Sequence, residues 1–398
     1  MKIGSQRDPR TRRAIAAVVA LAAAALAVLA STHVVEGRRS SSRSLSTTGE
    51  PRSLQLGRRD VVASLMQTQP QQSRKRKRLL SLTGRGPAAI ALAPHYLAWE
   101  YEQSKAHPLS ALMEGDRRTG KIRELASAVL PQFGLASTRT YVVYAGRNVS
   151  GSDLRAVRHD GSHRVVLSRS LAAPLASRGD MIAWAEQLGA YQRVVVRNMA
   201  TGHEWVAARM PRCRRDTCYR IDGVTLADDG VVFDRGAIGT QPSLIVRRRF
   251  GKTQPSRVSV KNDPQPDLAP SSAGAFYYWL QHGWMRWDFR ARRSQRTGLD
   301  AQRWWVVGYE HGRLLLRTGS QCRPRLIVRQ PGKRPQAVPA PASAPGSPKD
   351  FGPLCRLMTG FAWQGRRLVV AWAVLPRISL NSHTDVGLAG VVVETLIS

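Results

Sequence analysis

Residues 181–202 read MIAWAEQLGAYQRVVVRNMATG, and this stretch contains the pattern that decides the fold. An apolar run with an aromatic residue (181–184) is followed by a second apolar run (194–196) and by a polar turn that ends in Gly202. Short β-branched and aromatic runs bounded by turn residues are typical of β-strands. Glycine supplies the positive φ that a tight hairpin requires. The stretch therefore predicts a strand, a loop, a strand and a hairpin in succession.

The same arrangement recurs along the chain at nearly constant spacing. Aromatic residues take like positions in six strands, with steps of 45, 40, 49, 46 and 93 residues: Trp99, Tyr144, Trp184, Phe233, Trp279 and Trp372. The last step spans two periods, with an apolar strand (313–317) in its middle. Glycine turns repeat in phase in all units but the fifth and the last: Gly120, Gly161, Gly202, Gly251 and Gly332. A repeat of about 45 residues lies in the range of β-propeller blades.

These units predict an all-β fold, a β-propeller of about seven four-stranded blades over residues 78–398, with six or eight blades as alternatives. A lone four-stranded sheet cannot bury both faces, whereas sheets stacked around a ring can, and the ring leaves only short edges. The seventh unit ends with the chain and lacks a last strand, which residues 78–83 can supply. A β-sandwich or two separate β domains would also fit the strand pattern.

The layout resembles the β-propeller repeat proteins of the TolB-like and WD40-like kinds, in particular exported bacterial ones. The resemblance rests on HDGS (159–162), TGK (119–121) and the aromatic strand positions, and it covers roughly residues 78–398. Trp287-Asp288 is a Trp-Asp dipeptide that occurs once, so the repeated WD40 signature is absent.

The N-terminus predicts export. A basic segment (1–13) precedes a 17-residue apolar run (14–30), which is the order of a signal sequence. As a helix the run would span about 25 Å, slightly short of a bilayer core. It fits either a signal anchor or a signal peptide cleaved near Ala30. We therefore expect a membrane-anchored domain that faces outward, or a secreted one.

Residues 31–77 predict a disordered basic linker, with RKRKR (74–78) as its densest charge block. Such a block can be interpreted in three ways: as a solvated tether, as a contact site for anionic lipid or wall polymer, or as a nuclear signal. Export disfavours the nuclear signal, and with it nucleic acid as a partner. The formal net charge of the chain is +34, which allows an acidic partner, although Arg provides 52 of 61 basic residues as in GC-rich genomes.

The four cysteines form two local pairs, Cys213 with Cys218 and Cys322 with Cys355. In an oxidising compartment both pairs can close as disulfides. A zinc site is the less favoured alternative, because the spacing is unfamiliar and no histidine lies near either pair. Free thiols would follow if the export prediction were wrong.

No catalytic, metal-binding or cofactor-binding motif is present: the sequence has no G-x-S-x-G, H-E-x-x-H, phosphate loop or EF-hand. His159 and His163 flank a hairpin. We expect them to be solvated turn residues rather than a pair of metal ligands. Four acidic residues follow aromatic strands and either gather at the channel or are ordinary strand-end polarity: Glu100, Glu102, Glu186 and Asp234. Arg and aromatic residues interleave at 284–293 and 303–305. This pattern fits the stacking of a sugar or nucleic acid on the side chains, or simply Trp side chains that face inward and Arg side chains that face outward.

We therefore predict a non-catalytic binding or scaffolding module of the cell envelope. Its membrane contact would be the N-terminal segment, and its partner another envelope protein or an acidic polymer. The alternative is a propeller-based hydrolase with a central-channel site, for which three or more Asp, Glu, His or Asn side chains would converge at the channel mouth.

Overall fold

The computed structural model divides the chain into two units, Met1–Leu54 and Gln55–Ser398, and the described residues all belong to the second. The described ranges are 62–65, 76–84, 87–101, 110–148, 151–189, 191–211, 218–238, 242–261, 267–280, 282–320, 322–338, 340–341, 354–376 and 388–397. The predictions for residues 1–13, for 14–30 and for most of 31–77 fall outside them. Within these ranges no helix is long and apolar enough to cross a membrane.

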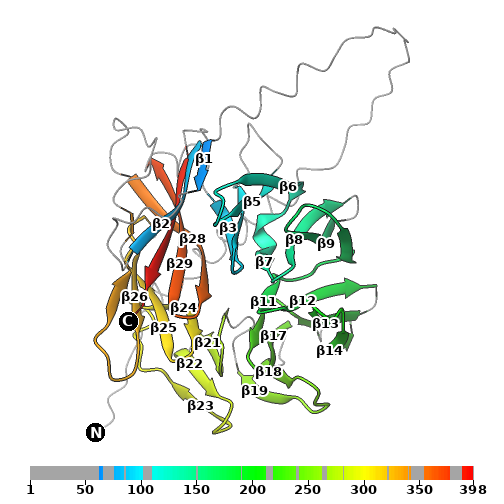
Figure 1. Ribbon diagram of the computed structural model, residues 1–398. Coiled ribbons are helices and arrows are strands. Elements are labelled where there is room, and N and C mark those ends of the chain that lie inside the picture. Colours follow the sequence, from blue (N-terminus) through cyan, green and yellow to red (C-terminus); the bar gives the residue numbers. More distant parts are fainter. Residues whose placement is uncertain are drawn as a thin grey trace, which may run out of the picture. The chain divides into compact units, whose positions relative to one another are not determined.

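The described strands form seven four-stranded antiparallel blades that follow one another along the chain (Figure 1). Blades 1 and 2 belong to one sheet through the pairing of Val129 with Gly146. The first three blades are β3 (Pro87–Leu92), β4 (Tyr96–Tyr101), β5 (Ser110–Asp116) and β6 (Ile122–Val129); β7 (Leu135–Ser137), β8 (Tyr141–Asn148), β9 (Gly151–Arg158) and β10 (Arg164–Ser168); and β11 (Ala176–Arg178), β12 (Met181–Leu188), β13 (Tyr191–Asn198) and β14 (Glu204–Pro211).

Blades 4 to 6 repeat this order, and blade 4 carries an extra strand, β15 (Cys218–Arg220), on β17. They are β16 (Val224–Ala227), β17 (Gly230–Ile238), β18 (Ser243–Arg249) and β19 (Ser256–Val260); β20 (Leu268–Ala269), β21 (Ala275–Trp279), β22 (Gly283–Asp288) and β23 (Arg293–Arg296); and β24 (Trp305–Glu310), β25 (Arg313–Thr318), β26 (Arg325–Arg329) and β27 (Gln336–Val338). A 3-10 turn, Pro131–Phe133, links blades 1 and 2.

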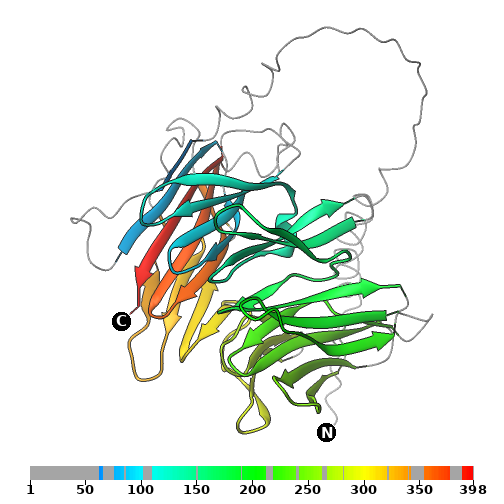
Figure 2. The same ribbon diagram turned by 45° about the vertical axis from the view of Figure 1, so that its right-hand side comes forward.

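Blade 7 combines strands from both ends of the unit. It consists of β28 (Leu354–Gln364), β29 (Arg367–Pro376), β30 (Leu388–Leu396) and, as its outer strand, β2 (Arg76–Gly84), which pairs antiparallel with β30. The predicted closure by residues 78–83 is thus confirmed. A further strand, β1 (Val62–Leu65), pairs with β2, so ordered strand extends into the segment that we assigned to the linker. Figure 2 shows β2 in blue beside β30 in red.

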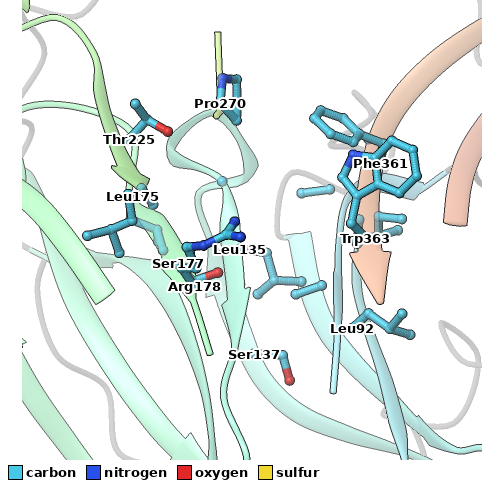
Figure 3. A pocket seen from close by; sticks show the side chains of 18 of the residues that line it. Leu92, Leu135, Ser137, Leu175, Ser177, Arg178, Thr225, Pro270, Phe361 and Trp363 are labelled. Atoms are coloured by element: carbon cyan, nitrogen blue, oxygen red, sulfur yellow. The ribbon is translucent and has the colours of Figure 1, made fainter. Parts of the chain in front are cut away.

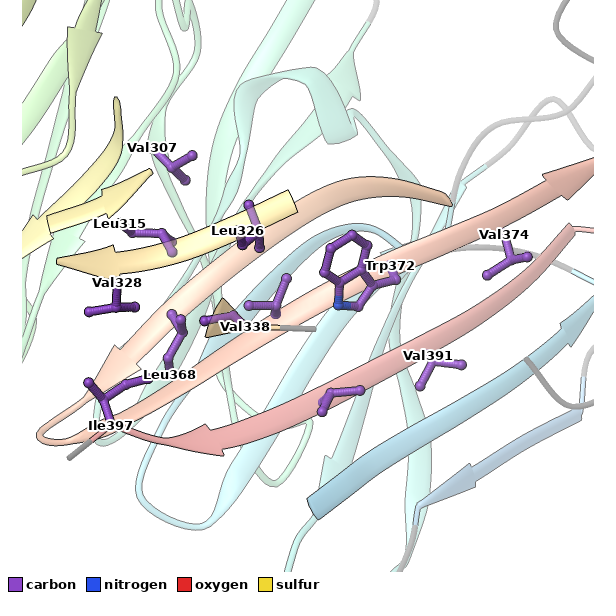
Figure 4. Packing of buried hydrophobic residues seen from close by; sticks show 12 residues of the cluster. Val307, Leu315, Leu326, Val328, Val338, Leu368, Trp372, Val374, Val391 and Ile397 are labelled. Carbon is purple, nitrogen blue, oxygen red and sulfur yellow. The ribbon is translucent and has the colours of Figure 1, made fainter. Parts of the chain in front are cut away.

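The core lies between the blades. The buried apolar residues fall into seven clusters, and each cluster joins two successive blades, including blades 7 and 1. On β29, Trp372 and Val374 pack toward blade 6 (Figure 4). Val369 and Ala371 on the same strand pack toward blade 1. Because side chains alternate along a strand, a strand with both faces buried is apolar throughout. This explains the continuous apolar runs in the sequence.

The repeated aromatic residue has the same role in nearly every blade. Trp99, Tyr144 and Trp184 lie on the second strand of their blade and pack against the preceding blade, and so do Phe233 and Trp372. In blade 5 the prediction of Trp279 was wrong. Tyr277 is the fully buried residue there, and Trp279 is half-buried at the strand end on the same face.

The predicted glycine turns join the third and fourth strands of blades 1, 2, 3, 4 and 6, and each glycine has a positive φ between 68° and 82°. Blade 5 lacks the glycine and places Arg292 at φ 52° instead. There the Asp288 carboxylate accepts hydrogen bonds from the amides of Arg290 and Ala291, at 2.8 and 3.0 Å. The same kind of cap, from Asp116, Asp160 and Asn198, holds the turns of blades 1 to 3, so blade 5 keeps the cap and lacks only the glycine.

Cys322 and Cys355 form the predicted disulfide, which joins the β25–β26 loop of blade 6 to β28 of blade 7. Cys355 is buried, and the amide of Arg356 donates to the Cys322 carbonyl at 2.9 Å. Cys218 lies in β15, but Cys213 falls outside the described residues, so the second predicted pair stays a prediction.

Candidate functional site: the central channel

The innermost strands of all seven blades line a cavity of about 530 Å³. Successive innermost strands contact one another around the ring, and β28 returns to β3, where Gly360 lies against Ile90. Figure 3 shows Phe361 and Trp363 on β28 across the cavity from Leu175 and Thr225. Since every blade contributes, only the closed ring builds this site.

Small residues make the cavity possible. β3 contributes Ala89 and Ala91, and β28 contributes Gly360 and Ala362. At Gly308 on β24, a Cβ atom would come within 2.7 Å of the Phe361 ring, so glycine at this position makes room for the aromatic side chain beside the channel. The wall therefore combines glycine and alanine positions with larger apolar side chains such as Leu175 and Phe361, and hydroxyls such as those of Ser137 and Thr225 lie between them.

An ion-pair cluster lies at the end of the channel where the first strands turn into the second strands. The Arg178 guanidinium, at the end of β11, donates two parallel hydrogen bonds to the Glu310 carboxylate on β24, at 3.0 and 3.1 Å. The bond links blade 3 to blade 6. Arg178 Nε also contacts the Asp228 carboxylate in the β16–β17 turn of blade 4. Arginine forms such two-point contacts with a carboxylate because its donors are fixed in a plane.

His311 completes the cluster from the β24–β25 turn. Its Nδ1 lies 2.9 Å from Glu310 and its Nε2 lies 3.2 Å from Asp228. The turn is tight, with positive φ at both His311 and Gly312. Burial lowers the pKa of Arg178, but its hydrogen bonds and charge contacts with Glu310 and Asp228 outweigh this effect and raise the pKa. The two carboxylates thus share one permanent positive charge.

This cluster was not predicted from the sequence, because Arg178 and Glu310 are separated by 132 residues. A weak signal exists in hindsight: both residues end the first strand of their unit, directly before a turn that contains glycine. Three Asp, Glu and His side chains do converge at the mouth, as the hydrolase alternative requires, but Arg178 lies between them. Among the described residues, no group of three or more His, Cys, Asp or Glu side chains is arranged to hold a metal ion.

The predicted acidic residues do not form a common site. Glu100, Glu186 and Asp234 are buried in blades 1, 3 and 4, none lines the cavity, and Glu102 lies outside the described residues. Glu186 contacts Arg193 and Ser168, and it accepts a hydrogen bond from Trp184 Nε1 at 3.3 Å. Each of these three residues thus has surroundings of its own within its blade.

Two buried carboxyls have raised pKa values. Burial raises the pKa of Glu100 to about 8, and among the described residues neither of its oxygens has a hydrogen-bond partner. Burial also raises the pKa of Asp234 to about 7, although Asp234 accepts hydrogen bonds from the amides of Asp222 and Gly223, at 2.8 and 2.7 Å. Desolvation disfavours the charged form in both cases.

The expectation that His159 is solvated was wrong. Its ring is buried, stacks on Tyr96 at 4.2 Å, contacts the Glu114 carboxylate through Nδ1 and lies 2.9 Å from the Thr138 carbonyl through Nε2. The hairpin of blade 2 is therefore fastened to blade 1. His163 on the same hairpin is exposed, as expected.

In the two segments where Arg and aromatic residues interleave, 284–293 and 303–305, most of the aromatic side chains pack the blades together. Trp284 and Trp287 are buried between blades, and Arg286 lies over the rings of Phe276 and Tyr309 at 5.9 and 5.8 Å. Trp305, which is 36% exposed, packs edge-on against Trp284 with 5.1 Å between ring centroids.

No family model and no curated protein matches the sequence. Solved structures do match the fold. A prolyl endopeptidase structure gives a TM-score of 0.53 at 12% identity, over 75% of this chain and 47% of that one. The β-propeller domain of the Trilobed protease from Pyrococcus furiosus, described as having an open velcro topology, gives 0.50 at 8% identity, over 74% and 92%.

An acylaminoacyl peptidase from Pyrococcus horikoshii gives a TM-score of 0.48 at 8% identity, over 72% of this chain and 49% of that one. This chain thus spans about half the length of the two whole peptidases that it matches. At such low identity the likeness shows the fold alone, which is a β-propeller.

Proposed function

We propose that the chain is a non-catalytic binding module of the cell envelope, exported and either anchored by its N-terminal apolar segment or secreted. The proposal keeps the resemblance to exported TolB-like and WD40-like propellers. Its role would be to hold another envelope component on the ring while leaving that component chemically unchanged.

The observation that carries this proposal is the pairing of the acidic groups at the channel mouth. Arg178 forms two hydrogen bonds with Glu310 and also contacts Asp228, so both carboxylates already have a cationic partner before any ligand arrives. A catalytic base needs a lone pair that can reach a substrate proton. A clamp between blades 3, 4 and 6 has no such need, and it suits a ring that must stay rigid while it binds.

One observation favours the alternative, a hydrolase with a central-channel site. His311 lies within hydrogen-bond distance of both Glu310 and Asp228 at an open channel end, and a histidine oriented by a carboxylate is a common acid–base pair. The structural neighbours include peptidases, but the likeness to them is one of fold.

Sedimentation with isolated cell envelopes tests both ideas. The full chain is incubated with envelopes and centrifuged, and the supernatant is analysed by mass spectrometry for released fragments. We expect the protein in the pellet and no fragments. The matched variant is Glu310→Gln, which should pellet equally.

Protein that stays in the supernatant would overturn the binding proposal. Fragments released by the natural chain but not by Glu310→Gln or His311→Gln would overturn the non-catalytic reading in favour of the hydrolase.

A further inference from the structure

We propose that one face of the ring, where the hairpins between third and fourth strands lie, binds an acidic polysaccharide. We call it the hairpin face and define it by the residues at the hairpin tips: 116–121, 158–164, 198–203, 249–256, 288–293 and 329–336. The inference rests on the proposed binding function and names the partner class.

Backbone hydrogen bonds hold these hairpins at the same end of the ring as the turns between first and second strands. In blade 1 the Arg117 amide donates to the His95 carbonyl at 2.8 Å. The same bond recurs in three further blades, from His159 to Thr140 at 3.2 Å, from Met199 to Asp180 at 2.8 Å and from Phe250 to Asp229 at 3.0 Å. The tips therefore form one face by construction.

The tips are strongly basic in five blades. Twelve of their Lys and Arg residues are exposed: Arg118, Lys121, Arg158, Arg164, Arg249, Lys252, Arg290, Arg292, Arg293, Arg329, Lys333 and Arg334. Only blade 3 departs, since its tip reads NMATGH (198–203). A basic surface of this kind attracts polyanions.

The acidic residues on these tips do not balance the charge. Asp116, Asp160 and Asp288 are the carboxylates of the described tips, and each accepts hydrogen bonds from amides of its own turn. Backbone amides lower the pKa of Asp116 and Asp288, and the Ser162 hydroxyl and amide lower that of Asp160. Three carboxylates thus serve the turns, and of the twelve exposed cations around them Arg249 is paired with Asp229 in the β16–β17 turn, at 3.3 Å.

The start of β2 lies at the same end of the ring as the hairpin tips. β2 begins at Arg76, and its register pairs Arg76 with Thr395 and Lys77 with Glu394 on β30. This end of β30 adjoins the β28–β29 turn, because the Ile397 amide donates to the Arg366 carbonyl at 2.9 Å. The backbone of β2 at Arg76 therefore lies at the same end of the ring as the hairpins.

The chemistry favours an acidic polysaccharide over a bilayer. Arginine, which makes up nine of the twelve exposed cations, forms two-point hydrogen bonds with carboxylates. Of the large apolar side chains with high exposure in the described part, which a bilayer interface would bury, only Leu396 at the end of β30 lies at this end of the ring outside the tips. The others are Val166 on β10, Leu280 after β21 and Trp305 at the start of β24. A flexible chain with a carboxylate on each repeat can contact successive hairpins, whereas nucleic acid does not share the expected compartment.

Polygalacturonate is the probe, measured by titration calorimetry with the full chain at several salt concentrations. The test variant is Arg290→Gln/Arg293→Gln/Lys333→Gln/Arg334→Gln, on the tips of blades 5 and 6. The matched control is Arg169→Gln/Arg303→Gln/Arg323→Gln/Arg325→Gln, which removes the same charge from exposed residues at the opposite end of the blades. Neutral dextran, anionic vesicles and duplex DNA are run alongside.

We expect the test variant to lose at least tenfold in affinity for polygalacturonate and the control less than twofold, with a shallower salt dependence in the test variant only. Equal losses in both variants, or tighter binding of vesicles or DNA than of polygalacturonate, would overturn the inference. If the test variant loses its affinity for polygalacturonate but still pellets with envelopes, the proposed binding function stands, and the protein binds envelopes through a surface other than the hairpin face. If the natural chain does not pellet at all, the proposed function itself fails.

Discussion

Charged residues in the interior of the ring and those on the hairpin face differ in how completely they are paired. In the interior, Arg178 and Arg193 meet carboxylates, and most buried carboxylates meet an arginine or a backbone amide. On the hairpin face, exposed cations outnumber carboxylates. The comparison teaches that, in the described part of the chain, a buried charge almost always has a partner because water is excluded there. Exposed cations need no partner, although some, such as Arg249 with Asp229, also form ion pairs.

The largest effect is expected at Glu100, the interior carboxylate that breaks this pattern because it has no partner among the described residues. Its pKa of about 8 in the fold exceeds the ordinary 4.5, so the folded state holds a proton that the unfolded state releases. Stability should therefore fall as pH rises from about 4.5 to about 8, by up to about 5 kcal/mol. Glu100→Gln should remove this dependence, as urea unfolding at pH 5 and pH 8.5 would measure. Parallel pH profiles for variant and natural chain would contradict the assignment.

The second effect is expected at the channel mouth. Arg178→Met leaves Glu310 and Asp228 close together without their guanidinium, which should destabilise the fold by about 2 kcal/mol. The double variant Arg178→Met/Glu310→Leu should recover much of that loss. Thermal unfolding measures both, with the exposed Arg303→Met as control. An unchanged midpoint for Arg178→Met would show that the cluster is not a clamp.

A sharper form of the comparison uses two histidines of one hairpin. His159→Ala loses the stacking on Tyr96 and the contacts with Glu114 and Thr138, so we expect about 2 kcal/mol of destabilisation. His163→Ala, at an exposed position, should change stability by less than about 0.5 kcal/mol. Equal effects in a denaturant titration would contradict the buried role of His159.

The smallest effect on stability is expected on the hairpin face. The variant Arg290→Gln/Arg293→Gln/Lys333→Gln/Arg334→Gln should unfold within about 1 kcal/mol of the natural chain, because exposed charges contribute little to folding. A large drop in the unfolding midpoint would mean that these side chains hold the ring together, and it would remove the distinction between interior and surface charge.

The sequence allowed the ring to be predicted because each blade repeats one local pattern. Trp99, Trp184 and Trp372 mark a position that packs against the preceding blade, and turn glycines such as Gly202 mark a hairpin that needs a positive φ. The closing strand was predictable for a similar reason, since the last unit lacked one strand and an apolar segment preceded the first.

The candidate site was not predictable in the same way. The fifth unit misled us because Trp279 and Tyr277 share a face of one strand, and only packing decides which is buried. The contact of Arg178 with Glu310 depends on which blades face each other across the channel. His159 looked like a turn residue because its partner Glu114 belongs to the neighbouring blade. Local patterns determine the blades, whereas these contacts depend on how the blades meet.

The central claim is that residues from both ends of the described unit close the ring, through β2 and β30. Hydrogen–deuterium exchange of the full chain tests it directly, by following the amides of 76–84 and 388–396. The account predicts that both segments are protected together, on the same timescale as the second strands of the other blades. Exchange of 76–84 within seconds, while 367–376 stays protected, would contradict the closure and with it the channel that all seven blades line.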